Sequence, residues 1–293
     1  MLQDVVEYLA CPHCGLALAQ AADGRSLRCQ DRHSFDIARQ GYASLLPGDA
    51  HTGTGDTAAM VAARDAFLGA GHYAPIAAAL AAAAPTDTAP TEPAPTETAG
   101  AAAGRRCVVD LGAGTGHYLA AVLDALPEAH GIALDISKFA LRRAARAHPR
   151  AGAVVCDAWR PLPLRDGVAD LVLNVFAPRN GPEIRRVLRP GGSLLVVSPT
   201  PRHLTELVRE LGLLGVDDRK PERLAATLGP YLEPAGDSEH TFPLLLDHAA
   251  VRTVAGMGPS AWHTDQDALA ERIGALPDLV PVTASVTLSR FTR

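Results

Sequence analysis

The run VVDLGAGTG, from Val108 to Gly116, places three glycines between an apolar stretch and a segment with helical periodicity. Glycine at positions 112, 114 and 116 lets the backbone turn tightly and lets a ligand approach the main chain. A strand, a glycine-rich turn and a helix in this order are the local context in which nucleotide-type loops occur. The run therefore favours an α/β fold whose first strand leads into a ligand-binding turn.

Short apolar runs recur after this turn. They cover residues 107–111, 131–136, 153–156, 170–176 and 193–197. Each run is bounded by turn formers and rich in β-branched or small apolar residues, as buried parallel strands are. Helical patterns at 118–126 and 138–147 separate the first three runs, so we predict an α/β fold with a doubly wound, Rossmann-like sheet. Residues 201–214 predict a further helix and residues 280–291 a closing strand or hairpin, whereas residues 215–275 show no clear pattern.

Composition and motifs divide the chain into four parts. Residues 1–47 hold three of the five cysteines, and residues 48–84 include a helical pattern at 57–68. Residues 85–104 repeat proline, threonine and alanine without large apolar positions, so they cannot bury enough surface to offset their ordering entropy. We therefore predict a cysteine-containing module, a helical connector, a flexible linker and, at 105–293, the domain with the glycine-rich turn.

Acidic residues near the turn favour S-adenosylmethionine over a dinucleotide. Asp110 stands two positions before the first glycine, where a carboxylate can meet a cationic group, and the spacing is GxGxG rather than GxGxxG. Asp135 ends the second predicted strand, where a carboxylate accepts hydrogen bonds from ribose hydroxyls. Asp157 ends the third, in position to bind the adenine amino group. The predicted cofactor-binding residues are therefore Asp110, Gly112, Ala113, Gly114, Thr115, Gly116, Asp135, Asp157 and Ala158.

Three cysteines and a histidine near the N-terminus have metal-ligand spacing. Cys11 and Cys14 form a CxxC pair, and Cys29 and His33 form a second pair. Two such pairs on facing turns complete a tetrahedral zinc site. Four protein ligands leave no open coordination position, so we expect one structural Zn²⁺ per chain that supplies much of the module's folding free energy. His13 lies between the first two thiols and is expected to be exposed.

The formal net charge of −5, from 27 basic and 32 acidic residues, argues against a surface that binds any polyanion. Local basic groups remain: we expect the module's arginines to contact phosphate, whereas the basic run at 138–150 fits a solvated helix face equally well.

The first residues lack the form of a secretory signal, and the cysteines do not suggest a disulfide framework. No apolar run reaches the roughly 18 residues of a membrane helix. We therefore expect a cytoplasmic protein. The arginines of residues 1–47 that we expect to contact phosphate are Arg25, Arg28, Arg32 and Arg39.

The motifs DLGAGTG, ALD, CDA and LRPGG, in this order, resemble class I methyltransferases. Together with CPHC, CQDRHSFD, ARQGYASLLP, GHYAP, NVFAPR and SPTPRHLTEL, they make the chain similar to the RlmA/TlrB family of 23S rRNA guanine-N1 methyltransferases. The resemblance implies an N-terminal zinc ribbon that helps to recognise RNA, and a Rossmann-like methyltransferase domain. It also implies a homodimer and cofactor contacts at Tyr73 and His203.

The same resemblance implies a target guanine in a stem-loop of 23S rRNA near the peptide exit tunnel. The Gram-positive-type branch of the family is associated with resistance to tylosin-like macrolides, and the composition suits that branch. Such a guanine must leave its stack before it can react. At the end of the fourth predicted strand, Phe176 can stack on the flipped base and Asn174 can read its edge, although Phe176 fits a core position equally well. The sequence identifies no general base.

Two other functions fit parts of the sequence. A class I methyltransferase acting on a small molecule would have the same core motifs, but the ribbon would then have no role. A zinc-dependent RNA-binding protein with an inactive core would explain the ribbon. The intact glycine-rich turn and Asp135 argue against that loss of cofactor binding.

Overall fold

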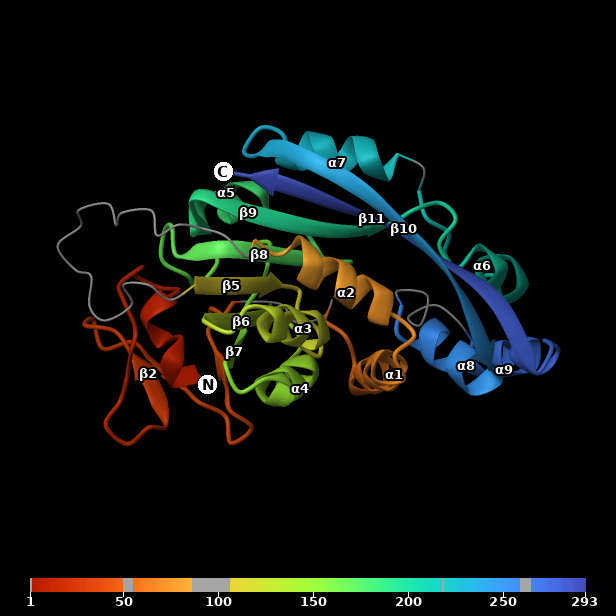
Figure 1. Ribbon diagram of the computed structural model, residues 1–293. Coiled ribbons are helices and arrows are strands. Elements are labelled where there is room, and N and C mark those ends of the chain that lie inside the picture. The colour runs from red at the N-terminus through yellow and green to blue at the C-terminus, as the bar shows by residue number, and fades with distance from the viewer. Residues whose placement is uncertain (1, 50–54, 86–105, 218, 259–264) are drawn as a thin grey trace.

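The computed structural model describes residues 2–49, 55–85, 106–217, 219–258 and 265–293 (Figure 1). An eight-stranded sheet in the order β10-β11-β9-β8-β5-β6-β7-β4 forms its centre. The five predicted parallel strands are all present and pair in parallel with their neighbours, which confirms the predicted fold class. They are β5 (Arg106–Leu111), β6 (Ala129–Asp135), β7 (Ala151–Val155), β8 (Ala169–Val175) and β9 (Leu188–Pro199).

Two long antiparallel strands complete one side of the sheet. β11 (Leu279–Thr292), the predicted closing strand, pairs with β9 and with β10 (Glu233–Asp247). β10 lies in the part of the sequence that shows no clear pattern, because it is the edge strand and most of its residues are exposed. Among its described residues, that part also contains the helices α7 (Lys220–Leu228), α8 (His248–Gly256) and α9 (Gln266–Gly274).

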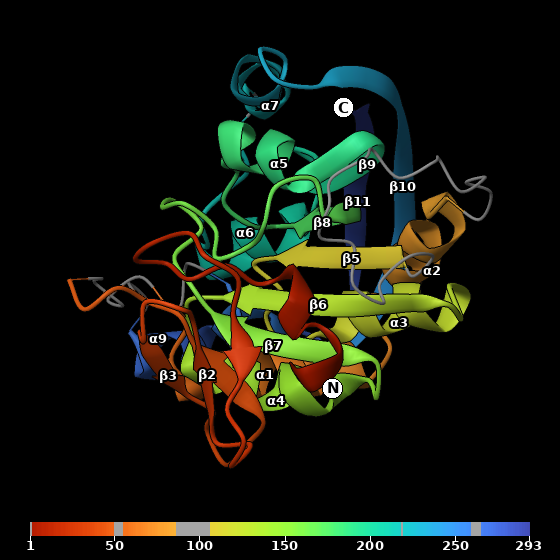
Figure 2. The ribbon, with the colours of Figure 1, turned by 90° about the vertical axis from the view of Figure 1, so that its left-hand side faces the viewer.

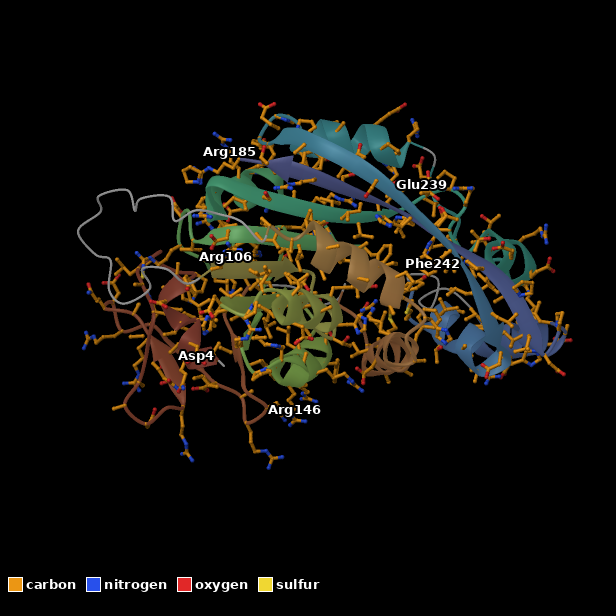
Figure 3. The ribbon with its side chains drawn as sticks, viewed as in Figure 1. Asp4, Arg106, Arg146, Arg185, Glu239 and Phe242 are labelled. Atoms are coloured by element: carbon orange, nitrogen blue, oxygen red, sulfur yellow. The ribbon has the colours of Figure 1, made fainter. Side chains whose placement is uncertain are left out.

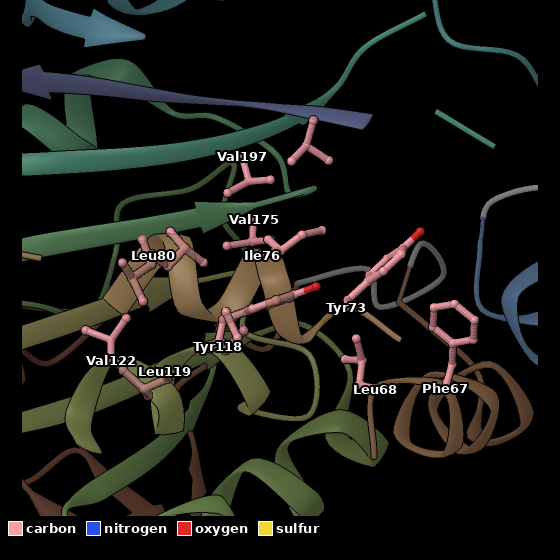
Figure 4. Close-up of a cluster of buried hydrophobic side chains, with 14 of the residues drawn as sticks. Phe67, Leu68, Tyr73, Ile76, Leu80, Tyr118, Leu119, Val122, Val175 and Val197 are labelled. Atoms are coloured by element: carbon pink, nitrogen blue, oxygen red, sulfur yellow. The ribbon is translucent and has the colours of Figure 1, made fainter. Parts of the chain in front are cut away.

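Helices and the N-terminal module cover the two faces of the sheet (Figures 1 and 2). One apolar cluster joins the sheet to α1–α4, α6, α8 and α9, and a second joins it to the N-terminal module, α5 and α7. Figure 4 shows part of the first cluster around Tyr118 and Ile76. The bounds of the remaining helices are α1 (Ala58–Gly69), α2 (Ala74–Ala83), α3 (His117–Ala125), α4 (Lys138–Ala147), α5 (Gly181–Val187) and α6 (Thr205–Leu211).

The helix boundaries follow from local chemistry. α1 begins after Thr57, whose side chain accepts a hydrogen bond from the backbone N–H of Met60, as an N-cap residue does. α6 is shorter than the predicted helix at 201–214, because Leu204 has a φ of +55° and the residues before it form a turn. No single helix among the described residues is long and apolar enough to cross a membrane; α1 and α2 meet that test only as a pair bent by 78°.

The N-terminal module contains two 3₁₀ turns and its own small antiparallel sheet. The turns are η1 (Leu2–Asp4) and η2 (Val6–Tyr8), and the strands are β1 (Ala19–Gln20), β2 (Ser26–Arg28) and β3 (Ser34–Asp36). Between the turns, Val5 packs on β7, where a side chain at Gly152 would bring its Cβ to 2.3 Å from Val5 Cγ2.

The next strand joins the module to the central sheet. β4 (Tyr42–Ser44) pairs in parallel with β7, as the outermost strand on that side. The predicted module boundary at residue 47 thus falls after a strand of the central sheet. The predicted linker at 85–104 lies, apart from Pro85, outside the described residues.

Candidate functional site

A cavity of about 790 Å³ opens at the carboxyl ends of the parallel strands. This is where open α/β sheets bind ligands, and the volume lies within the range of roughly 300–1,000 Å³ found for small-molecule sites. Most of the predicted cofactor residues line it. They are Tyr73, Gly112, Ala113, Gly114, Thr115, Asp135, Asp157, Ala158 and His203, and Phe176 lines it with them. Asp110, Gly116 and Asn174 do not line it.

The glycine-rich turn crosses the ends of β5 and β6. The backbone N–H groups of Gly112 and Ala113 both donate to the carbonyl of Leu134, at 2.8 and 2.9 Å. Gly112 has a φ of +79°, and a Cβ there would lie 2.4 Å from Cβ of Ala177. Any side chain at this position would therefore push the turn away from the loop after β8. Gly116 serves packing instead, since its Cβ would lie 3.0 Å from Cβ of Ala147 on α4.

Asp135 is held at the end of β6 by two backbone donors. Its Oδ2 accepts from the N–H of Gly114 at 2.9 Å, and its Oδ1 accepts from the N–H of Ser137 at 2.8 Å. Burial raises the pKa of this carboxyl group. Each carboxylate oxygen can accept a second hydrogen bond, so the group remains able to bind hydroxyls of a ligand.

Asp157 lies at the next strand end, and its neighbour is a residue that the sequence motifs did not single out. Oδ1 of Asp157 accepts from the backbone N–H of Trp159 at 2.9 Å. The Trp159 side chain lines the cavity and is 67% exposed, the largest exposed fraction among the large hydrophobic residues described. Its place directly after CDA was the available signal, because an aromatic there can cover one side of an adenine ring.

Asp110 lies beneath the turn rather than in the cavity wall. It is 1% exposed, and neither carboxylate oxygen has a hydrogen-bond partner among the described residues. Burial, followed by the negative charge of Asp135, raises its pKa to about 8. Asp110 therefore does not line the cavity itself, and its contact with a cationic group of the cofactor stays a prediction.

Three aromatic side chains from distant segments meet in the cavity wall. Tyr73 precedes α2, Phe176 follows β8, and His203 lies in the turn before α6. The ring centroids lie 6.3 Å apart for Tyr73 and Phe176, and 5.9 Å apart for Phe176 and His203. Phe176 has a φ of +54° and is 40% exposed, so it is not a core residue. Figure 4 shows the Tyr73 ring extending away from α2.

Hydrogen bonds fix the tautomer of His203. The backbone N–H of Ser285 donates to Nδ1 at 3.1 Å, so Nδ1 carries no proton. Burial lowers the pKa of His203 to about 4, so the ring is neutral at neutral pH and its proton is on Nε2. Nε2 lies 2.9 Å from Oη of Tyr73 and donates to it. The hydroxyl proton of Tyr73 is then left to donate elsewhere. No sequence motif points to Ser285 as a residue of the site.

Asn174 is buried behind the cavity wall and forms hydrogen bonds to backbone carbonyls near it. It is 0% exposed, and its Nδ2 donates to the carbonyl of Pro178 at 2.8 Å and to that of Leu111 at 3.4 Å. The amide therefore holds the loop that carries Phe176. The amide donors are used within the protein, whereas the buried Oδ1 has no hydrogen-bond partner among the described residues, so a contact of Asn174 with the edge of a base stays a prediction.

The cysteines and histidine of the N-terminal module converge. The ligand atoms of Cys11, Cys14, Cys29 and His33 all lie within 4.8 Å of one another. Nδ1 of His33 is 3.5 Å from Sγ of Cys11 and 3.4 Å from Sγ of Cys29, and the Sγ atoms of Cys14 and Cys29 are 3.7 Å apart. Tetrahedral zinc with ordinary Zn–S and Zn–N distances sets such edges at about 3.5–3.8 Å. The donor set and its spacing fit zinc, while His13 is exposed, as expected, and stacks on Phe35.

Basic side chains gather on α4 and on the module beside it. Lys138 and Arg142 are exposed and flank the ring of Phe139 at 5.5 and 5.4 Å. Arg146 is exposed farther along the helix, in an outward-pointing position (Figure 3). α4 abuts the module, since a Cβ at Gly41 would lie 3.8 Å from Cβ of Ala145 on α4. The module's own exposed arginines are Arg25, Arg28, Arg32 and Arg39.

Comparison with known proteins gives consistent matches over both parts of the chain. A zinc-ribbon family model described as "RlmA, N-terminal" matches residues 9–52, and a methyltransferase domain model matches residues 108–192. The 23S rRNA (guanine(748)-N(1))-methyltransferase of Streptomyces fradiae is 53% identical, over 99% of this chain and 98% of that protein. A Micromonospora griseorubida protein provisionally described as a 23S rRNA (guanine-N(1)-)-methyltransferase is 57% identical, over 99% of both chains.

A solved structure supports the fold alone. It is a chain of the complex between the Haloferax volcanii Trm112 methyltransferase activator and a methyltransferase. Its TM-score is 0.51 at 19% identity, over 81% of this chain and 97% of that chain.

Proposed function

Because the chain belongs to the RlmA-type family of 23S rRNA guanine-N1 methyltransferases, we propose that it transfers the methyl group of S-adenosylmethionine to N1 of guanine 748 in 23S rRNA. The observation that carries the proposal is a cofactor-sized cavity with an exposed aromatic ring, Phe176, in its wall. A ring in that place can stack on a base that has left its helix. The macrolide resistance that the resemblance implies is part of the same proposal.

S-adenosylmethionine supplies the electrophilic methyl group, and the chain's own residues orient it. Asp135 is proposed to hold the ribose hydroxyls and Asp157 the adenine amino group, with the turn from Gly112 to Gly116 against the rest of the cofactor. Tyr73 and His203 complete the contacts at the Phe176 side. Alignment of an attacking nitrogen with a methyl group can supply roughly 7–11 kcal/mol of the barrier reduction, so positioning is the main task of the site.

The proton on guanine N1 must leave before or during attack, and the geometry limits which group can take it. His203 cannot, because Nε2 carries a proton and the lone pair of Nδ1 is used by Ser285. Tyr73 is instead a hydrogen-bond donor within the site, since its oxygen accepts from His203. We propose that it donates to the bound cofactor, as the family resemblance implies.

The zinc ribbon is proposed to hold one Zn²⁺ through Cys11, Cys14, Cys29 and His33, in a structural role. Its arginines and the exposed cations of α4 lie on neighbouring surfaces, so we propose that both contact the rRNA stem-loop. A homodimer and a cytoplasmic location remain predictions of the sequence.

The test uses the full-length protein, labelled S-adenosylmethionine and unmodified 23S rRNA. We expect label in the RNA and a primer-extension stop at guanine 748, because an N1 methyl group blocks Watson–Crick pairing. An Asp135→Ala variant that keeps its zinc is the control and should give neither signal. Transfer of label to a small molecule, with none in RNA, would support the small-molecule alternative; RNA binding without transfer would support an inactive core.

A further inference from the structure

The cavity has an acidic half and a basic half. Asp56, Asp135 and Asp157 line the half next to the glycine-rich turn, where the ribose and adenine are proposed to bind; Arg64, which also lines this half, pairs with Asp56. On the other side, Lys220 and Arg223 line the wall formed by the start of α7, and one acid, Asp217, lines the cavity with them. A single binding site with opposite charges at its two ends is suited to two ligands, or two parts of a ligand, of different charge.

A third cation, Arg179, adjoins the basic half. Its Nη2 donates to Oγ of Ser198 at 2.8 Å, and its buried Nε has no hydrogen-bond partner among the described residues. Burial, followed by the positive charges of the nearby Arg179 and Arg223, lowers the pKa of Lys220, and the negative charge of Asp217 offsets part of this effect. Asp217, which also lines the cavity, forms its ion pair with Arg223 at 2.7 Å. Within the described part of the chain, neither Arg179 nor Lys220 has a carboxylate at ion-pair distance.

Holding like charges together in a partly buried place costs free energy unless an anion joins them. An RNA substrate carries such an anion next to every base, and a phosphate contact fixes the strand while a base is out of its stack. Arg179 follows Phe176 by three positions in the same loop, so an anion here would lie near a base stacked on that ring.

We propose that Arg179 and Lys220 bind a backbone phosphate of the RNA strand that carries the target guanine. The proposal rests on the proposed function and names a contact within it. One other anion has the same chemistry, the carboxylate of the cofactor's methionine portion. The experiment must therefore separate RNA binding from cofactor binding.

The first test compares full-length wild type with Lys220→Gln and Arg179→Gln, using a transcript of the target stem-loop and S-adenosylhomocysteine. We expect the Kd for the RNA to rise about tenfold or more in each variant, as for loss of one charge-assisted hydrogen bond. The slope of log K against log salt should fall by about one. The Kd for S-adenosylhomocysteine should stay within twofold of wild type. Lys220→Arg should restore most of the RNA affinity.

Arg209→Gln is the matched control, because Arg209 is an exposed cation on α6 that pairs with Glu210 and does not line the cavity. It should leave both affinities unchanged. Unchanged RNA affinity and salt slope in Lys220→Gln would overturn the proposal, and so would an equal loss of cofactor affinity, which would assign the cations to the methionine carboxylate. Thermal unfolding of each variant shows that it is folded; if Arg179→Gln unfolds, Lys220→Gln still decides.

The second test identifies the phosphate. Synthetic stem-loops carry one uncharged methylphosphonate on either side of the target guanosine. At the contacted position, wild type should bind the methylphosphonate RNA more weakly than the unmodified RNA. Lys220→Gln should bind the two RNAs with similar affinity, because this variant already lacks the lysine charge that pairs with the phosphate. Equal further losses in both proteins at both positions would contradict the contact. Wild type that binds but methylates no RNA would instead count against the proposed function.

Discussion

Oη of Tyr73 and Nε2 of His203 lie 2.9 Å apart, although 130 positions separate the two residues in the sequence. A third segment fixes the direction of this hydrogen bond, since the N–H of Ser285 in β11 occupies Nδ1 of His203. The relationship ties the segment before α2, the turn before α6 and the strand β11 to one point of the cavity wall. Because Nε2–H of His203 donates to Oη of Tyr73, the hydroxyl group of this buried tyrosine can donate its own proton to another acceptor.

Replacing Tyr73 by phenylalanine removes that donor and leaves Nε2–H of His203 without its acceptor. We expect the Kd for S-adenosylmethionine to rise about tenfold and the free energy of unfolding to fall by about 1–2 kcal/mol. Calorimetric titration and urea unfolding measure the two effects. Tyr231→Phe is the control, because that ring packs near Gly181 outside the cavity. Wild-type affinity in Tyr73→Phe would contradict the donor role.

The pH dependence of stability should reveal His203. Its pKa in the folded state is about 4, below the ordinary value of 6.5, so between these values the unfolded chain binds more protons. The free energy of unfolding should therefore fall as the pH is lowered from 6.5 towards 4. Urea unfolding at several pH values should show a shallower fall for His203→Asn than for wild type. Parallel curves would mean that His203 titrates normally.

Asp110 should show the opposite dependence. Its pKa in the folded state is about 8, above the ordinary 3.8, so the folded chain binds more protons between these values and loses stability as the pH rises through them. Asp110→Asn removes the buried ionisable group, and we expect its stability relative to wild type to increase steadily from pH 4 to pH 8. The same series of urea unfolding curves measures this. A constant difference between the two proteins would refute the raised pKa.

Gly112→Ala should disable the cofactor site without unfolding the chain. The added Cβ would lie 2.4 Å from Ala177 at a φ of +79°, so the turn or the loop with Phe176 must move. We expect binding of S-adenosylmethionine to weaken by more than tenfold, with a loss of about 1–3 kcal/mol of stability from backbone strain. Gly191→Ala is the control: it has a similar φ of +76° but open space around its Cβ, so it should share the strain and keep the affinity.

Zinc content should depend on the four converging ligands alone. We expect about one zinc ion per chain in wild type and in Cys107→Ala, whose thiol lies buried in β5, and much less in Cys29→Ser. Atomic emission measures the metal, and thermal unfolding should show that Cys29→Ser and the chelator-treated wild type lose stability together. Full zinc occupancy in Cys29→Ser would rule out the proposed ligand set.

Besides β11, whose alternating pattern marks it as a strand, the strands that could be predicted from the sequence are those buried on both faces. In β5, for example, five of the six residues are buried and four of these five are apolar, and such runs are visible without knowledge of their neighbours. β10 is different, because its side chains mostly face solvent and its place is set by pairing with β11 along fourteen positions. β4 is only three residues long, and nothing in Tyr42–Ser44 itself shows that it belongs to the large sheet.

The parts of the site that could be predicted are those in which one short sequence motif contains the residues that bind one ligand. The glycine-rich turn, Asp135 and the cysteine and histidine spacing are of this kind. Ser285 was not, because its contact with His203 depends on the register that places Val286 of β11 opposite Pro199 of β9. Phe176 was undecided because the end of a strand can face the core or the cavity, and only the folded structure, in which its side chain is 40% exposed and lines the cavity, settles the direction.

The strand that the ribbon contributes has a consequence for solubility. Without β4, the backbone N–H and C=O groups of β7 would form an open edge next to the apolar residues Ala153 and Val154. Open edges of this kind are where sheets of different molecules join and aggregate. The N-terminal module thus shields the catalytic domain from its own copies, and a methyltransferase domain cut free after residue 47 would lose β4 and this protection with it.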